Sequence, residues 1–165
     1  MAHIRPYNST DWTAVERIMQ EGIDTGVATF ETQPKPQKKW ETESIPETQL
    51  VAVGENEEVL GWTVLWPVSD RCTYAGVAEV SVYVSASAQG QGIGKLLLTK
   101  LIEKSEEIGI WSIQAGIFED NPGSMALHLS CGFRLVGYRE KIGKLHGIWK
   151  NNQQFERRSK KVGID

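Results

Sequence analysis

The sequence AEVSVYVS at residues 78–85, followed by QGQGIGK at 89–95 and LLL at 96–98, decides the fold of this chain. Valines at positions 80, 82 and 84 alternate with other residues, which is the period of a β-strand. After Gly94 the apolar residues change to helical spacing and predict one buried stripe of Ile93, Leu97, Leu101 and Ile108. The stretch therefore predicts a strand, a glycine-rich turn and a helix.

The turn has glycine at positions 90, 92 and 94, so its backbone N–H groups can approach a ligand at the positive end of the helix dipole. This arrangement suits a phosphate or a pyrophosphate. A Walker loop would need glycine at Gln89 and Ser or Thr at Leu96, and a dinucleotide fingerprint would need glycine at Lys95. The alternative is an ordinary surface turn, but glycines at a helix start weaken the helix without adding packing.

Length and composition exclude several classes of protein. A chain of 165 residues, 40% hydrophobic, fits one globular domain, taken as residues 1–157 with a polar tail at 158–165. A net charge of −3 and a pI of about 5.7 give no basic field for nucleic acid, and the basic cluster Arg157–Lys161 is expected to be solvated. No apolar run reaches membrane-spanning length, and the charged N-terminus does not resemble a signal peptide. Cys72 and Cys131 form neither a disulfide framework nor a metal spacing, so we expect a cytoplasmic protein without a metal.

The rest of the chain alternates between strand and helix patterns. Strands are expected at 2–6, 49–54, 59–68, 111–118, 133–142 and 149–155. Helices are expected from a cap at Thr10 or Asp11 to about Gly26, over 38–44 with Trp40 as its anchor, and from Asn121 to Gly132. Residues 27–34 form an extended segment and 69–76 a loop. This order predicts an α/β fold in which helices cover both faces of a mixed sheet.

Glu79 is the first catalytic candidate. A carboxylate that points inward from a sheet covered on both faces is unfavourable unless it is paired or used. A carboxylate with a raised pKa can act as a general base and take a proton from a substrate, directly or through water. Alternatively, Glu79 lies on the solvated side of an edge strand or forms a structural ion pair.

His128 is the second candidate. Asn121, Ser124 and His128 are three and four residues apart and share one helix face, which could carry polar groups to a ligand. The imidazole could donate a proton to a leaving group or act as a base. There are alternatives for each residue. Asn121 could cap the helix, Ser124 could simply lie in its first turn, and His128 could be structural.

These motifs together resemble those of a known family. Gln89-x-x-Gly92-x-Gly94 after Val-Tyr-Val resembles the acetyl-CoA loop of the GCN5-related N-acetyltransferases, the GNAT superfamily, and Cys131-Gly132-Phe133 resembles its closing motif. His128 stands where a tyrosine, often the general acid, is common, and histidine there is a feature of the phosphinothricin and methionine sulfoximine acetyltransferase group. Three further segments resemble that group: residues 29–34, Arg71-x-x-Tyr74 with the strand that follows it, and Lys144-x-x-Gly147-x-Trp149. The likeness spans Ile4 to about Arg157, with one departure at Lys150, where the group often has an acidic residue.

The resemblance implies a mixed, mostly antiparallel sheet flanked by helices, and a role for most of the residues above. Val82 and Val84 would offer backbone groups to the pantetheine arm, and the Val82 N–H would polarise the thioester carbonyl. The pyrophosphate would be held by Gln89, Gly90, Gln91, Gly92, Ile93, Gly94 and Lys95, with Asn121 and Ser124 as further cofactor contacts. The acceptor side would comprise Phe30, Glu31, Arg71, Tyr74 and Tyr83, and Arg71 has the fork geometry that binds a carboxylate.

The expected function is acetyl transfer from acetyl-CoA to the α-amino group of a small amino-acid analogue of the phosphinothricin, methionine sulfoximine or methionine sulfone type. Direct attack by the amine is expected because Cys131 has no evident base. The alternatives are a polyamine or a peptide N-terminus as acceptor, and a non-catalytic acyl-CoA sensor. The resemblance also implies a homodimer, while the charge and hydropathy of the chain predict neither nucleic acid nor membrane as a partner.

Overall fold

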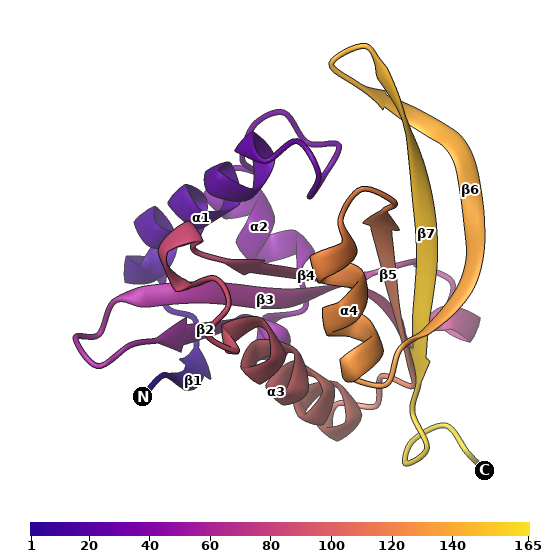
Figure 1. The fold of residues 1–165 in the computed structure, drawn as a ribbon. Helices are drawn as coiled ribbons and strands as arrows, with labels where there is room; N and C mark the ends of the chain where they lie inside the picture. Colours follow the sequence, from indigo (N-terminus) through magenta and orange to yellow (C-terminus); the bar gives the residue numbers. More distant parts are fainter.

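Seven strands form a single sheet in the order β1-β2-β3-β4-β5-β7-β6 in the computed structural model, which describes residues 1–165 (Figure 1). The strands are β1 (His3–Pro6), β2 (Leu50–Val53), β3 (Val59–Pro67), β4 (Val77–Val84), β5 (Ser112–Phe118), β6 (Arg134–Leu145) and β7 (Ile148–Arg158). The helices are α1 (Trp12–Asp24), α2 (Gln37–Glu43), α3 (Ile93–Glu107) and α4 (Pro122–Ser130). The element order confirms the predicted α/β fold.

The sheet is antiparallel except where β4 lies beside β5. That parallel pairing is short and joins Val77–Glu79 to Ser112–Gln114. Beyond Glu79, β4 continues to Val84 beside β3 but no longer pairs with β5. The expected mixed, mostly antiparallel sheet is confirmed, and it opens between β4 and β5.

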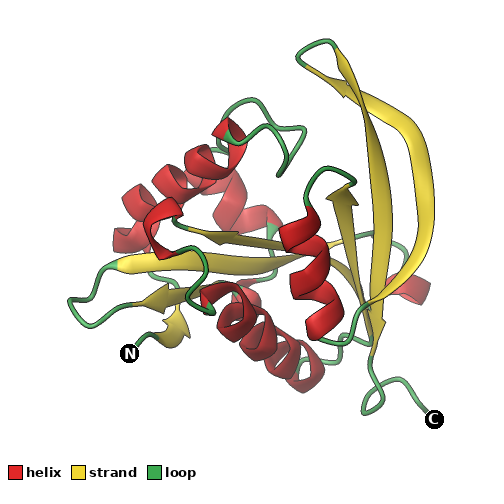
Figure 2. Cartoon of the chain, in the orientation of Figure 1, coloured by secondary structure: helices red, strands yellow, loops and turns green.

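Helices lie on both sides of the strands (Figure 2). The residues of β4 alternate between the two faces, as the valine pattern predicts. Val80 packs in the cluster that contains Leu98 and Leu101 of α3, whereas Tyr83 packs against the cluster formed by α1, α2 and β3. Trp40 anchors α2 in that second cluster with no exposed surface, as expected from the sequence. The two cores therefore fix β4 from both sides.

The start of the first helix differs from the prediction. Asn8 and Asp11 form a capping box on a 3-10 turn, η1 (Ser9–Asp11), that precedes α1. The Asp11 carboxylate is occupied by the Asn8 N–H at 2.9 Å and by the guanidinium of Arg5 at 2.8 and 2.9 Å. Neither Thr10 nor Asp11 caps α1 with its side chain, because the polar groups of this segment are used one turn earlier.

The end of α3 and the C-terminal segment also correct the sequence analysis. Ile108 follows the last residue of α3 and is 36% exposed, because the chain turns at Gly109 and Ile110 enters the core instead. The segment at 158–165 does not begin as a solvated tail. Ser159 is buried and donates a hydrogen bond to Glu106 at 2.9 Å, and Arg157 reaches the same carboxylate at 3.2 Å.

The last two strands are longer than predicted and form a hairpin that extends beyond the helices (Figure 1). We expected β6 to end at Ile142, because glycines and lysines near the turn obscured the alternation, and β7 to end at Phe155, whereas β7 pairs with β5 as far as Arg158. Pairing reaches Leu145 and Ile148 at the tip. This hairpin reaches the part of the molecule where β4 and β5 diverge, and it contributes residues to the site described below.

Candidate active site

A cavity of about 1010 Å³ lies where β4 separates from β5. Its walls come from β4, the turn before α3 and the first turn of α3, α4 along its length, the end of α1 and the segment after it, and the strands β5, β6 and β7. Most predicted site residues line it: Phe30, Glu31, Glu79, Val82, Tyr83, Val84, Gln89, Gly90, Gly92, Ile93, Gly94, Lys95, Asn121, Ser124 and His128. A cavity of this size is at the upper end of those that hold small ligands and cofactors.

The edge of β4 presents unpaired backbone groups to this cavity. Ser85 donates its N–H to Leu60 O at 2.8 Å, on the β3 side. Because successive N–H groups of a strand point to opposite sides, those of Val82 and Val84 point away from β3, to the side that β5 has left. An extended ligand can therefore pair with this edge as an added strand would.

The glycine-rich turn adopts a conformation that requires glycine at two positions. Gly90 and Gly92 have φ values of 73° and 80°, and Gly92 is the left-handed N-cap residue of α3. The first hydrogen bond of the helix is donated by Leu96 to Gly92 O at 3.0 Å, so the N–H groups of residues 93–95 precede it and face out of the helix end. This end of a 15-residue helix is suited to an anion.

The two glutamines of the turn brace it in different ways. Gln89 donates its side-chain amide to Val84 O at 3.0 Å, which ties the turn to the end of β4. Gln91 donates to Ser87 O at 3.3 Å and is the one predicted loop residue that does not line the cavity.

Glu79 extends into the cavity from the last residue pair that β4 shares with β5. Its side chain is exposed to the cavity rather than enclosed between sheet and helix, because the opening of the sheet leaves this face uncovered. Its carboxylate makes no hydrogen bond or salt bridge inside the protein. Partial burial raises the pKa of Glu79, and the positive charge of Arg139 offsets part of that rise. The site therefore holds a free carboxylate that binds a proton more readily than an ordinary glutamate does.

His128 lies buried at the cavity wall with a fixed tautomer. Its Nδ1 lies 2.7 Å from Ser124 O, and because a carbonyl can only accept, Nδ1 carries the proton. Burial lowers the pKa of His128, although the hydrogen bond to Ser124 acts in the opposite direction. The imidazole is accordingly neutral at neutral pH, with its N–H engaged and its Nε2 lone pair free. This state suits an acceptor of protons better than a donor.

Asn121 has a structural task at the cavity edge. Its side-chain oxygen accepts the N–H of Ser124 at 3.2 Å and caps α4, as one of the predicted alternatives held. Its amide donates to Val27 O at 3.2 Å and ties the segment after α1 to α4. Both ends of the side chain are therefore used within the protein.

Aromatic side chains line part of the cavity. Phe30 meets the ring of Phe118 edge-on, with 4.6 Å between ring centres, and its ring lies against Gly143 of β6. Tyr83 stacks on Trp62 at 4.8 Å, and its ring lies against Gly22 of α1. The segment after α1, the sheet and the hairpin thus meet around one apolar patch.

Two residues assigned to the acceptor are not brought to this cavity. Tyr74 ends a 3-10 turn, η3 (Cys72–Tyr74), and Arg71 immediately precedes that turn. Arg71 lies over the ring of Tyr74, 6.0 Å from its centre, and both residues are exposed outside the cavity lining. Cys131 also lies outside the lining.

The hairpin contributes polar cavity residues that the sequence analysis did not identify: Arg139, Asn152 and Gln154. Arg139 pairs in register with Asn152. The run NNQQ at 151–154, in an otherwise strand-like segment, was a usable signal, because it places two amides on each face. The partner strands are distant in sequence, so nothing local indicated which face meets the cavity.

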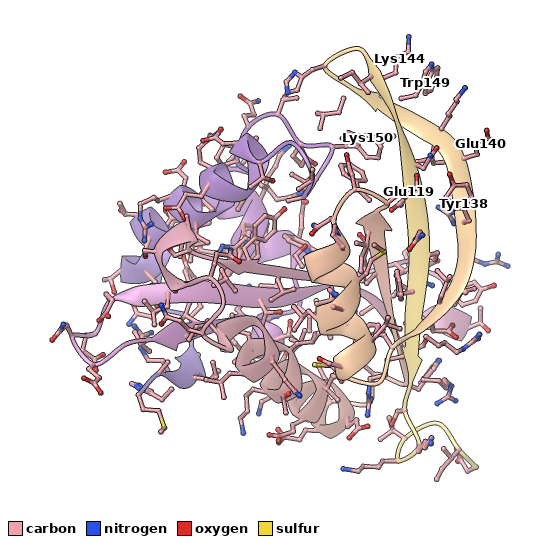
Figure 3. The ribbon with its side chains drawn as sticks, viewed as in Figure 1. Glu119, Tyr138, Glu140, Lys144, Trp149 and Lys150 are labelled. Carbon is pink, nitrogen blue, oxygen red and sulfur yellow. The ribbon has the colours of Figure 1, made fainter.

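Charged and aromatic residues fix the hairpin to the turn between β5 and α4 (Figure 3). Lys150 lies 2.6 Å from Asp120 and above the ring of Phe118, so the unusual lysine is paired and does not line the cavity. Glu119 accepts hydrogen bonds from Asn151 at 2.7 Å and from Tyr138 at 3.5 Å. These contacts hold β6 and β7 at the cavity.

The structure contains neither a candidate metal site nor a helix that could span a membrane. No group of three or more histidine, cysteine, aspartate or glutamate residues lies close enough to hold a metal ion. None of the helices combines the length and apolar character needed to cross a membrane.

Comparisons with known proteins agree with this geometry. Residues 12–133 match the Acetyltransferase (GNAT) family. A phosphinothricin N-acetyltransferase of Streptomyces viridochromogenes is 32% identical over 149 residues, which cover 88% of this chain and 81% of that protein. An L-methionine sulfoximine/L-methionine sulfone acetyltransferase of Pseudomonas paraeruginosa is 34% identical over 100 residues, or 61% of this chain and 58% of that protein. A GNAT superfamily phosphinothricin acetyltransferase from Sinorhizobium meliloti has been crystallised in complex with AcCoA. Its structure superposes on this chain with a TM-score of 0.90 and is 29% identical in sequence. The superposition covers 99% of this chain and 91% of that one.

Proposed function

Because this chain belongs to the acetyltransferase (GNAT) family, we propose that it transfers acetyl from acetyl-CoA to the α-amino group of a small amino-acid analogue. The relatives named for phosphinothricin and for methionine sulfoximine or sulfone support this acceptor class. The observation that carries the proposal is a free carboxylate, Glu79, in the same cavity as an unpaired strand edge and an anion-binding helix end.

The residues of the cavity fit acetyl-CoA in two places. The N–H groups of residues 93–95 and the left-handed Gly90 and Gly92 form a backbone cradle for a pyrophosphate, and Lys95 adds a positive charge. The free edge of β4 at Val82 and Val84 can pair with the amides of the pantetheine arm. When bound, acetyl-CoA supplies the acetyl thioester that the amine attacks.

Glu79 is the proposed general base. An amine reaches the site as an ammonium ion and is nucleophilic only after it has lost a proton. Burial raises the pKa of Glu79, which makes its carboxylate a better proton acceptor than an ordinary glutamate. The Val82 N–H, which points to the same cavity, is placed to polarise the carbonyl.

We propose direct attack by the amine with no acyl-enzyme. Cys131 is the nearest thiol in sequence to the site, but it lies outside the cavity, and the hydroxyl of Ser130 at 3.8 Å is no base for it. His128 keeps its Nδ1–H on Ser124 O, so we assign it the support of α4 or a proton-accepting role rather than that of general acid.

The charges of the cavity separate this acceptor from a polyamine. A polycation calls for several free carboxylates, and of the three that line the cavity Glu21 is already bound to Arg17 and to the N–H of Ala86, which leaves two. Arg139 adds a positive charge to the same space. A peptide N-terminus and a non-catalytic acyl-CoA sensor remain alternatives for the experiment to separate.

We further propose a cytoplasmic homodimer. Its support is the set of half-exposed apolar residues on the hairpin, which are Leu135, Val136, Ile142, Ile148 and Trp149. The two free thiols suit a reducing compartment. The molar mass in solution tests the dimer.

The decisive experiment is thiol release from acetyl-CoA with a panel of acceptors: methionine sulfone, methionine sulfoximine, phosphinothricin, spermidine and an alanine-started peptide. Turnover confined to the first three is the expected result. Turnover with only the peptide or only spermidine would show that the acceptor is not a small amino-acid analogue. Acetyl-CoA binding without turnover of any amine would favour the sensor.

A further inference from the structure

The charges that line the cavity divide into an engaged set and a free set. Its acidic residues are Glu21, Glu31 and Glu79, and its basic residues are Lys95 and Arg139. Glu21 is held by Arg17 and the Ala86 N–H, and Lys95 lies in the first turn of α3 at the cofactor end. The acceptor end is therefore left with two carboxylates and one guanidinium.

The guanidinium of Arg139 forms no salt bridge and donates no hydrogen bond, a property that it shares only with Arg71 among the arginines of this chain. Carboxylates or backbone carbonyls hold the guanidinium groups of five other arginines, which are Arg5, Arg17, Arg134, Arg157 and Arg158. Arg71 at least lies on the ring of Tyr74. Arg139 is exposed into the cavity with its five donors free.

The neighbours of Arg139 are those expected of a binding site. Asn152 lies opposite it in the register of β6 and β7, so the two side chains share the cavity face. The side-chain oxygen of Asn152 is buried and has no hydrogen-bond partner. A buried acceptor without a partner is unfavourable, so a ligand donor or a reoriented guanidinium would stabilise this arrangement.

Arg139 and Glu79 provide opposite charges within one cavity although their strands are not adjacent. β4 and β6 are separated in the sheet by β5 and β7. The positive charge of Arg139 nevertheless acts on the pKa of Glu79, so the two groups share one electrostatic environment. An amino acid has matching charges, an ammonium and an acidic group, a short distance apart.

We infer that Arg139 binds the acidic group of the acceptor, its α-carboxylate, while Glu79 takes the ammonium. This inference rests on the proposed function and adds to it the residue that selects amino acids over simple amines. A guanidinium binds a carboxylate through two parallel hydrogen bonds, which fixes the orientation of the acceptor as well as its charge. Arg139, which lines the cavity, thus takes the carboxylate-binding role that was expected of Arg71.

The test compares Arg139→Ala with Arg134→Ala as a matched control. Arg134 lies on the same strand, is paired with Glu156 at 2.9 Å and does not line the cavity. Thiol release is measured at saturating acetyl-CoA with methionine sulfone and with its carboxamide, which keeps the amine and removes the negative charge. Because Arg139 makes no internal bond, its replacement should leave folding and the KM for acetyl-CoA unchanged.

We expect Arg139→Ala to raise the KM for methionine sulfone by roughly ten- to a hundredfold, the loss of a charge-assisted bidentate contact. The carboxamide should be used equally well by this variant and by the wild type, and Arg134→Ala should alter neither substrate. Arg139→Lys should recover part of the loss, because lysine keeps the charge without the fork.

Three results would overturn the inference. An equal change for the acid and the carboxamide would mean that Arg139 does not recognise the carboxylate, and so would an unchanged KM for the acid. If Arg71→Ala loses activity selectively with the acid while Arg139→Ala behaves as the wild type does, Arg71 rather than Arg139 binds the carboxylate. If the wild type acetylates the peptide but no amino acid, the proposed function itself fails, and this outcome is distinct because it is seen before any substitution is made.

Discussion

Replacing Glu79 by glutamine removes the proposed base and leaves almost the same volume. Glu79 makes no hydrogen bond or salt bridge inside the protein, so the amide should fit the cavity without repacking, and the fold should be retained. The glycine-rich turn and the free edge of β4 are unchanged in this variant. The KM for acetyl-CoA is therefore expected to remain at its wild-type value.

The expected loss is in kcat. Removal of a positioned general base typically lowers the rate by about two to four decades, which corresponds to roughly 3–5 kcal/mol of transition-state stabilisation. The loss should depend on pH, because an acceptor can also lose its proton to water. The activity of Glu79→Gln should rise by roughly tenfold per pH unit until the acceptor amine has titrated.

The activity of the wild type should also rise with pH, but over the range in which Glu79 loses its proton. Burial raises the pKa of Glu79, so the carboxylate is protonated, and activity is lost, at a higher pH than for an ordinary glutamate. The assay is kcat and kcat/KM for methionine sulfone against pH for the wild type and for Glu79→Gln. Glu103→Gln, which changes an exposed glutamate of α3 paired with Lys100, is the control and should behave as the wild type does.

The result that would refute the reasoning is a Glu79→Gln enzyme with wild-type kcat at neutral pH. A uniform loss at all pH values would also count against a base, since it would indicate damage to binding or folding. In either case the raised pKa of Glu79 would reflect only its position in the cavity.

Further predictions concern stability and the cofactor loop. Gly92→Ala should reduce the free energy of unfolding by about 1–2 kcal/mol and raise the KM for acetyl-CoA, because residue 92 has a φ of 80°. A methyl group at this position would touch nothing, so the cost comes from the backbone conformation alone. The control is Gly123→Ala, at an open site in α4, which should not destabilise the protein in chemical denaturation. Phe155→Ala should reduce stability by about 3–5 kcal/mol, since this ring is only 2% exposed in the main core, and a loss below about 1 kcal/mol would contradict the packing. Asp11→Asn should cost roughly 1.5–3 kcal/mol at neutral pH. The hydrogen bond from Arg5 lowers the pKa of Asp11, so this stabilisation is complete above the ordinary aspartate pKa of about 3.9 and lost as pH falls through the lower folded value. Denaturation curves of the two proteins should therefore converge in acid, and a constant difference would refute this assignment.

Some elements could be predicted from sequence because their signals are local. The alternation in β4 and the glycines at 90, 92 and 94 involve neighbouring residues, and each places its own backbone. The failures came where a local pattern met a longer-range constraint. Ile108 fits the helical spacing of α3, but the helix ends before it, and Ile110 enters the core in its place.

The site divides in the same way. The sequence by itself determined the strand, the glycine-rich turn and the helix start proposed to bind the cofactor, since these elements are contiguous and their chemistry is carried by the backbone. It also determined that Glu79 lies on the strand that leads into that turn. Only the tertiary structure decided that Arg139 and Asn152 line the cavity, that Arg71 does not, and that His128 is a buried neutral imidazole. The physical reason is that these properties depend on the divergence of β4 from β5 and on the long hairpin, which bring together residues far apart in the chain, and no local pattern encodes such distances or the burial that sets a pKa.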